Sequence, residues 1–185
     1  MELRDIPYKV SYRQVKYPRL EFKTGELLIV LPFGVNPEVL LDKYRDWIIK
    51  QVNFIKECLE NTKNNRLSRR TEEEFRKLIY DFTGKLSRDL KVEVNHIYFR
   101  KMKTKWASLS SARNLTANRL MKYLPEYLIE YVIYHELTHI IEKRHNERFW
   151  KIISQKYENY QEMEREMFIY WFLVFKKEDN MNMSL

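Results

Sequence analysis

The segment H-E-L-T-H constrains this fold more than any other feature, because His135, Glu136 and His139 form an H-E-x-x-H pattern in it. Residues four apart on an α-helix lie one turn apart on the same face, so the two imidazoles would converge on one point beside the carboxylate. His145 follows six residues after His139, so three of the four histidines fall within eleven residues. The pattern predicts a metal site on a helix.

The chemistry of this residue set favours zinc. A catalytic zinc ion takes three protein ligands and keeps a fourth position for water, whose pKa it lowers toward neutrality. Glu136 would lie next to that water, accept its proton and later pass it to the leaving group. We therefore expect a Zn2+-dependent hydrolase with His135 and His139 as ligands and Glu136 as general base.

The third ligand depends on where the helix ends. On a continuous helix, His145 would lie roughly 9 Å along the axis from His139, beyond coordinating range. Asn146 is a good N-cap for a new helix, which favours a break at about 143–145 that lets His145 fold back onto the metal. Glu142 is the alternative ligand if the helix continues, or it orients an imidazole or a substrate group from outside the metal shell. More distant acids are also open as the third ligand: Glu158, Glu162, Glu164 and Glu166.

Three segments carry a resemblance to a known family. They are K-M-K-T-K-W-A-S-L-S-S-A-R-N-L-T-A-N-R-L (101–120), P-E-Y-L-I-E-Y-V-I-Y-H-E-L-T-H (125–139) and H-N-E-R-F-W (145–150). They resemble the YgjP-like group of predicted metal-dependent hydrolases, which is similar to the SprT-like zinc peptidases and other small zincins. The resemblance extends to the N-terminal strand region and its L-P-F-G turn, so it covers most of the chain.

The resemblance implies both a fold and a site. The fold would be a small zincin-like α+β domain, with the H-E-x-x-H helix packed on a short antiparallel sheet, plus an N-terminal β region and helices. His135, His139 and His145 match the metal-ligand positions, and Glu136 matches the catalytic glutamate. Where the family has W-G-S-C, this chain has W-A-S-L at 106–109, so any role of that cysteine is absent here.

Periodicity and turn residues predict the same α+β class. The expected elements are a hairpin over 8–32 with a turn at 23–26, helices over 36–61 and 71–89, a strand over 91–106 paired with one over 114–123 through the S-S-A-R-N turn, and the active-site helix from 125. The helices at 36 and 71 have capping signals, respectively Asn36 before Pro37 and Thr71 three residues before Glu74.

Length and cysteine content suggest the organisation and location of the chain. With 185 residues it is long enough for one domain with a substantial core. We expect one domain over 1–185, made of an N-terminal β region (1–35), a helical region (36–90) and a zincin-like metal-binding core (91–185).

The sole cysteine, Cys58, excludes an intramolecular disulfide, and no charged-then-apolar leader opens the chain, so a cytoplasmic location is expected. The longest apolar run, 167–175, is too short to span a bilayer, so no membrane partner is expected.

An edge strand over 97–106 is expected above the metal cleft, where extended substrate backbone could pair with it. Lys101, Lys103 and Lys105 alternate onto one face of that strand, either as a solvated face or as an anion-binding one. Candidates for contacts with the substrate are Trp106, Asn118 and Arg119. Candidates for stabilising an oxyanion are Tyr131, Tyr134, Asn118 and Arg119.

The net charge of +8 invites partners with phosphate groups, because basic surfaces attract them without sequence information. No zinc-ribbon or helix-turn-helix signature accompanies the charge. The main hypothesis is therefore a zinc metallopeptidase that cleaves peptide or protein substrates with Glu136 as base. The alternatives are a metal-dependent hydrolase of nucleotide phosphoanhydrides, a nucleic-acid-associated SprT-like protease, and a non-enzymatic basic binding module. No heptad seam indicates an oligomeric state.

Overall fold

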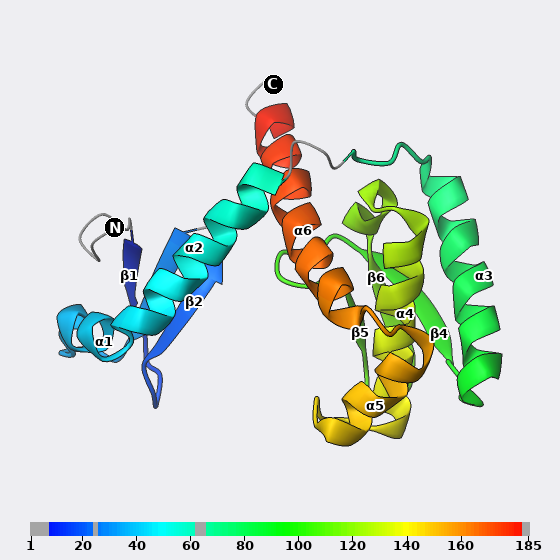
Figure 1. The fold of residues 1–185 in the computed structure, drawn as a ribbon, viewed down its shortest axis with the longest axis horizontal. Coiled ribbons are helices and arrows are strands. Elements are labelled where there is room, and N and C mark those ends of the chain that lie inside the picture. Colours follow the sequence, from blue (N-terminus) through cyan, green and yellow to red (C-terminus); the bar gives the residue numbers. More distant parts are fainter. Residues whose placement is uncertain (1–7, 24–25, 62–65, 183–185) are drawn as a thin grey trace. The chain divides into compact units, whose positions relative to one another are not determined.

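The computed structural model describes residues 8–23, 26–61 and 66–182. Its elements are β1 (Tyr8–Tyr12), β2 (Arg19–Lys23), β3 (Glu26–Leu31), α1 (Pro37–Lys43), α2 (Arg45–Asn61), α3 (Glu72–Leu90), β4 (His96–Arg100), β5 (Ala107–Leu109), β6 (Asn114–Asn118), the 3-10 helix η3 (Arg119–Tyr123), α4 (Glu126–Ile141), α5 (Glu147–Lys156) and α6 (Tyr160–Asn182). They fall into two compact units, residues 1–65 with 171–185 and residues 66–170 (Figure 1). Helices combined with two small sheets confirm the predicted α+β class. The single domain expected from the sequence stays a prediction.

The first unit is built around the central, buried strand β3. β2 pairs antiparallel with β3, which confirms a hairpin within the predicted segment, whereas β1 pairs parallel with the other edge of β3. Residues 24–25 of the expected turn lie outside the described residues. Apolar side chains of β3, α1 and α2 form one cluster, made of Leu27, Ile29, Leu31, Leu40, Leu41 and Ile48.

The single helix expected over 36–61 is two helices. Asn36 caps α1 as predicted, but Tyr44 leaves the helical backbone with φ −111° and ψ 19°, and α2 begins at Arg45. Asp42 and Arg45 form an ion pair across the break, with 3.5 Å between oxygen and nitrogen. The bend keeps the buried end of α1 and the buried start of α2 in the same cluster with β3.

The second unit contains the sheet β4-β6-β5. β5 pairs antiparallel with β6 through the expected S-S-A-R-N turn, where Arg113 has a left-handed backbone with φ 56°. β4 runs parallel to β6, so the expectation of an antiparallel pair between 91–106 and 114–123 is wrong for this edge. The physical reason is that 91–106 is not one strand, because the chain leaves β4, crosses over β6 through 101–106 and enters β5 on the other edge.

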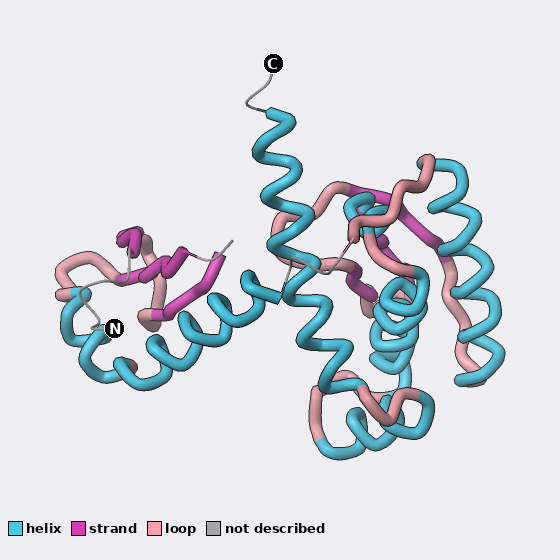
Figure 2. Tube along the Cα trace, turned by 45° about the horizontal axis from the view of Figure 1, so that its top comes forward, coloured by secondary structure: helices cyan, strands magenta, loops and turns pink. Residues whose placement is uncertain are grey.

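Helices α3 and α4 lie side by side in the second unit (Figures 1 and 2). α3 starts at the predicted capping box between Thr71 and Glu74. Arg70 fixes the start of α4 by donating to the carbonyl oxygen of Leu124 at 2.5 Å. Most of α4 is buried, through Leu128, Ile129, Tyr131, Val132, Ile133, Tyr134, Leu137 and Thr138. A helix buried on most of its faces holds the motif that it carries in a fixed position.

The chain beyond α4 forms α5 and α6, and the connection between α4 and α5 is short (Figure 2). The expected end of the active-site helix and a new helix after Asn146 are both confirmed. Among the described residues, no helix combines the length and the apolar character that crossing a bilayer requires.

Candidate metal centre

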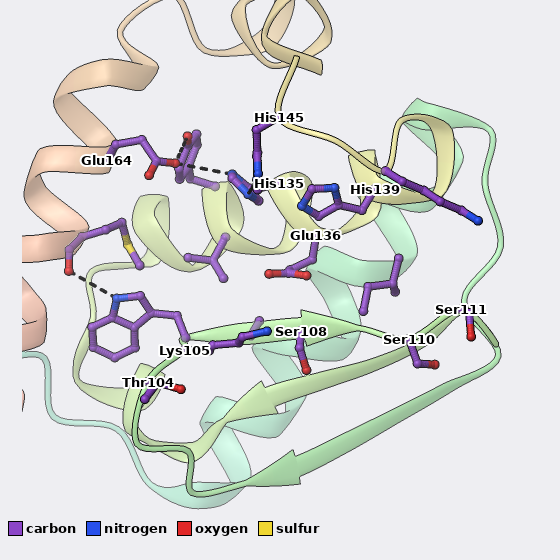
Figure 3. Close-up of a pocket in the computed structure, with 17 residues that line it drawn as sticks. Thr104, Lys105, Ser108, Ser110, Ser111, His135, Glu136, His139, His145 and Glu164 are labelled. Atoms are coloured by element: carbon purple, nitrogen blue, oxygen red, sulfur yellow. Dashed lines mark hydrogen bonds and ion pairs between the residues drawn. The ribbon is translucent and has the colours of Figure 1, made fainter. Parts of the chain in front are cut away.

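Three histidine side chains meet at the C-terminal end of α4 (Figure 3). The Nε2 atoms of His135 and His145 are 2.9 Å apart. One nitrogen from each of His135, His139 and His145 lies within 4.8 Å of the others. Nitrogens gathered this closely form a candidate set of ligands for one metal ion. The structure therefore brings together the three histidines that the sequence singled out.

The loop after α4 explains how His145 reaches the other two. Glu142 has extended backbone, with φ −136° and ψ 113°, and its carboxylate accepts the backbone N–H of Arg144 at 3.2 Å. Asn146 then caps α5 by accepting the N–H of Phe149 at 3.0 Å. These local bonds turn the chain within a few residues. His139 and His145 are therefore not separated by six residues of continuous helix, and their side chains can approach each other.

The outer ring nitrogens of two histidines have partners of their own. His139 Nδ1 donates to the backbone carbonyl of Glu142 at 3.1 Å. His135 Nδ1 lies 3.4 Å from the Glu164 carboxylate on α6, which also accepts the hydroxyl of Tyr131 at 2.5 Å. Metal-ligating histidines usually donate their second N–H in this way, which fixes the tautomer and the ring orientation. Glu142 thus contributes its carbonyl group to the site, while its carboxylate stabilises the loop.

The protonation of these groups suits a metal site. Burial lowers the pKa of His139 and of His145, and the nearby His135 lowers both pKa values further. Burial by itself would raise the pKa of the Glu164 carboxyl, but hydrogen bonds from His135 and Tyr131 bring that pKa below its usual value. The surroundings therefore favour neutral imidazoles at His139 and His145, the form that binds metals, and an ionised carboxylate at Glu164.

Glu136 lies between the histidines and strand β5 (Figure 3). Burial raises the pKa of its carboxyl, whereas the charge of His135, the backbone N–H of Leu109 and the charge of Lys105 act in the opposite direction. The side chain is half-buried and faces the same cavity as the three imidazoles. A carboxylate in this position can accept and return a proton beside a metal.

The three histidines, Glu136 and Glu164 line a cavity of about 680 Å³. Its lining residues are Thr104, Lys105, Trp106, Ala107, Ser108, Leu109, Ser110, Ser111, Tyr131, Val132, His135, Glu136, His139, Lys143, His145, Glu164 and Met167. Trp106 lines it as expected for a substrate-contact candidate, and its indole N–H donates to the carbonyl oxygen of Met167 at 3.2 Å. The segment around β5 forms one wall of the cavity.

Asn118 has a structural position outside the lining of this cavity. It is fully buried, and its side chain makes four hydrogen bonds of 2.7–3.2 Å, all with backbone groups of Met102, Lys105 and Leu120. All of its hydrogen-bonding groups are thus engaged within the protein. Asn118 fixes the segment that leads into β5, and this places it among the groups that shape the cavity rather than among those that face it.

The strand beside the histidines is β5, not the expected edge strand over 97–106. β4 and β5 form opposite edges of the sheet, and β5 with its flanking residues lines the cavity. Of the three alternating lysines, Lys105 lines it. Arg119 lies outside the lining and pairs with Glu72 at 3.4 Å. A two-residue alternation indicates extended chain but does not show where one strand stops and a crossing segment begins.

The expected oxyanion candidates Tyr131 and Tyr134 both have other partners. The hydroxyl of Tyr131 donates to Glu164, and that of Tyr134 donates to the carbonyl oxygen of Ile152 at 3.4 Å. Two neighbours of the site were not predicted in their roles, namely Glu164 and Lys143. Glu164 reaches the site through the path of α6, which no local sequence pattern indicates. Lys143 lies at the predicted helix break between His139 and His145, so that break could have pointed to it as a residue that lines the cavity.

Comparison with known families adds an independent observation. The model of the YgjP-like metallopeptidase domain matches residues 49–168, which is more than half of the chain and includes the three histidines and Glu136. This protein belongs to the YgjP-like family. The resemblance stated from the sequence is confirmed, and the YgjP-like domain is that of a metal-dependent peptidase.

Two solved structures are similar to part of this YgjP-like chain. The metallopeptidase zymogen abylysin of Pyrococcus abyssi is 21% identical with a TM-score of 0.45, over 48% of this chain and 90% of that one. The metallopeptidase zymogen jannalysin of Methanocaldococcus jannaschii is 27% identical with a TM-score of 0.43, over 49% of this chain and 86% of that one. No curated protein matches the chain.

Proposed function

We propose that this YgjP-like protein is a zinc metallopeptidase in which His135, His139 and His145 hold the metal and Glu136 is the general base. The main support is the convergence of three imidazole nitrogens within 4.8 Å, beside a half-buried carboxylate that faces the same cavity. Three neutral imidazoles leave a zinc ion electrophilic and with a position free for reaction, whereas a closed structural site uses four protein ligands and needs no base. Peptides or proteins are the substrates that this chemistry and the family support.

Each residue has a distinct part in the proposed reaction. A zinc ion held by the three histidines would polarise the scissile carbonyl and promote attack by water near neutral pH. Glu136 accepts a proton from the attacking water and later donates it to the nitrogen of the leaving amine. Burial raises the pKa of the Glu136 carboxyl, and the charge of His135, the backbone N–H of Leu109 and the charge of Lys105 oppose this rise and favour the ionised form, which is the form that acts as a base.

The partners of the outer ring nitrogens complete the proposal. Glu164 holds His135 with its Nδ1 protonated, and the Glu142 carbonyl group does the same for His139. In both rings this leaves Nε2 unprotonated for the metal. We therefore assign His145 as third ligand, Glu164 as a residue that orients His135, and Glu142 as one that acts through its backbone.

Metal content tests the ligand assignment. Elemental mass spectrometry of the purified wild type should find about one zinc per chain. Glu136→Gln should retain the zinc, and His145→Ala should lose most of it. Glu142→Ala is the matched control, since its carboxylate lies in the same loop and only its carbonyl contacts a histidine. Zinc kept by His145→Ala and lost from Glu142→Ala would reverse the choice of third ligand.

Activity tests the role of Glu136. A pool of fluorogenic peptides, assayed with zinc and again with a chelator, should show chelator-sensitive cleavage that falls about 100-fold or more in Glu136→Gln. Unchanged cleavage by a zinc-loaded Glu136→Gln variant would remove this residue as the base. Nucleoside triphosphates and single-stranded DNA belong in the same assay, because turnover of triphosphates alone, or cleavage only with DNA, would support the corresponding alternative.

A further inference from the structure

The charged side chains that line the cavity differ in whether they already have partners within the protein. Apart from the histidines they are Lys105, Lys143, Glu136 and Glu164. Both carboxylates already have partners within the protein, since Glu164 accepts the Tyr131 hydroxyl and lies against His135, while Glu136 is near the backbone N–H of Leu109 and the charges of His135 and Lys105. The charge that remains for a ligand is therefore positive.

The two lysines come from different segments that border the cavity. Lys105 lies just before β5, and its side chain is on the other side of Glu136 from the histidines (Figure 3). Lys143 lies in the loop between α4 and α5 that also carries His145. Both lysines are exposed, and neither forms an ion pair with any residue that the structure describes. A ligand lying along the cavity would thus meet positive charge at two places.

The wall around β5 adds neutral hydrogen-bonding groups. Hydroxyl side chains line it at four positions, Thr104, Ser108, Ser110 and Ser111. A hydroxyl can donate to a carboxylate, whereas an ionised carboxylate only accepts. The wall can therefore donate hydrogen bonds to an anionic ligand group, and its hydroxyls carry no charge that would oppose an anion.

We propose that this cavity selects peptides with aspartate or glutamate side chains close to the scissile bond, and that Lys105 and Lys143 determine this specificity. The inference rests on the metallopeptidase function proposed above and names its substrate class. A basic substrate side chain would meet two ammonium groups and no uncommitted carboxylate, so the arrangement both attracts acidic peptides and rejects basic ones.

The expected size of the effect follows from the exposure of the lysines. An ion pair with a solvated lysine changes affinity by about two- to five-fold, so two lysines together favour an acidic peptide by about four- to twenty-five-fold. The preference should shrink as salt is added, because exposed charges are screened over about 8 Å at physiological ionic strength.

Binding to the zinc-loaded Glu136→Gln variant tests the preference without turnover. Four fluorescent peptides are compared by anisotropy, three of them blocked at both ends and differing only in having Asp, Asn or Lys beside the central bond. The fourth is the Asn peptide with a free C-terminal carboxylate. We expect the Asp peptide to bind most tightly and the Lys peptide most weakly. Tight binding of the fourth peptide alone would assign the lysines to a chain terminus and overturn the proposal.

Substitutions then locate the effect. In the Glu136→Gln background, Lys105→Gln and Lys143→Gln should each reduce the preference for Asp over Asn about two- to five-fold with zinc content unchanged. Lys143→Glu should shift the preference toward the Lys peptide. Lys77→Gln is the matched control, since Lys77 is an exposed lysine on α3 outside the cavity lining, and it should change nothing.

The outcomes separate this inference from the function on which it rests. Equal binding of the Asp and Asn peptides, together with chelator-sensitive cleavage of both by the wild type, would overturn the specificity and leave the peptidase intact. No cleavage of any peptide by the zinc-loaded wild type would overturn both. An equal loss of kcat for all peptides in Lys105→Gln, with the binding preference unchanged, would assign Lys105 to the reacting carbonyl and remove it as a selector.

Discussion

At the scale of single residues, the Glu164 carboxylate decides which nitrogen of His135 faces the site. It lies 3.4 Å from His135 Nδ1 and accepts the Tyr131 hydroxyl at 2.5 Å. In Glu164→Gln the neutral amide would accept the Nδ1–H of the neutral His135 imidazole less strongly and would fix its tautomer less well, so zinc affinity should fall about 10- to 100-fold. Competition for zinc with a chromophoric chelator measures this change.

Glu166→Gln is the matched control for that prediction. Glu166 lies on the same helix and also accepts a tyrosine hydroxyl, from Tyr127, but it does not contact a histidine. The same loss of charge beside a tyrosine hydroxyl there should leave zinc affinity unchanged. If both variants lose zinc equally, the contact of Glu164 with Tyr131 matters only for packing α6 against α4.

The sequence predicted the ligands better than the groups that orient them. His135, Glu136 and His139 follow from helical spacing, and the place of His145 follows from the capping preference of Asn146. These are local rules. Glu164 depends on how α6 packs against α4, and a helical pattern by itself does not say which of its acids faces a partner, so from sequence Glu164 was one rival ligand among several.

At the scale of elements, Asn118 joins β6 and η3 to the crossing segment that leads into β5. Asn118→Ala would leave the buried backbone groups of Met102, Lys105 and Leu120 without these partners, so we expect the free energy of unfolding to fall by about 3 kcal/mol. Denaturant titration measures it. Asn95→Ala is the control, since the exposed Asn95 makes one bond of 2.8 Å to the carbonyl of Ala112, and it should cost about 1 kcal/mol or less.

Asn118→Ala should also affect the site, because the segment that Asn118 holds places Lys105 in the cavity wall. A folded Asn118→Ala protein should therefore lose part of its preference for acidic peptides while keeping its zinc. A stability equal to that of the wild type would show that other contacts hold the crossing segment.

The starts of helices were predictable where a local capping signal marks them. The capping box at Thr71 and the N-caps at Asn36 and Asn146 all appear in the structure. The parallel pairing of β4 with β6 was not predictable, because register and direction between strands depend on contacts between residues far apart in the chain. The break at Tyr44 also carried no Gly or Pro signal, and it serves the shared cluster of α1, α2 and β3.

At the scale of the whole molecule, the net charge of +8 does not by itself identify a partner. Most of the 34 basic residues say nothing about the site, and their number alone kept nucleotide and nucleic-acid hypotheses open. The structure shows which of these basic residues line the cavity, and they are Lys105 and Lys143. Composition cannot make this distinction because it carries no positions.

The division into two units gives a prediction for zinc removal. All proposed ligands and Glu164 lie within residues 66–170, so zinc should stabilise this unit by about 2.7 kcal/mol at a hundred times its dissociation constant. Hydrogen exchange read by mass spectrometry, with zinc and after chelation, should show added protection in α4, in the α4–α5 loop and around Glu164, with little change in β1–β3. The His145→Ala protein should show the smaller difference expected of a weakened site. Equal protection in both units would mean that the metal couples to the stability of the entire chain, and it would support the single domain expected from the sequence.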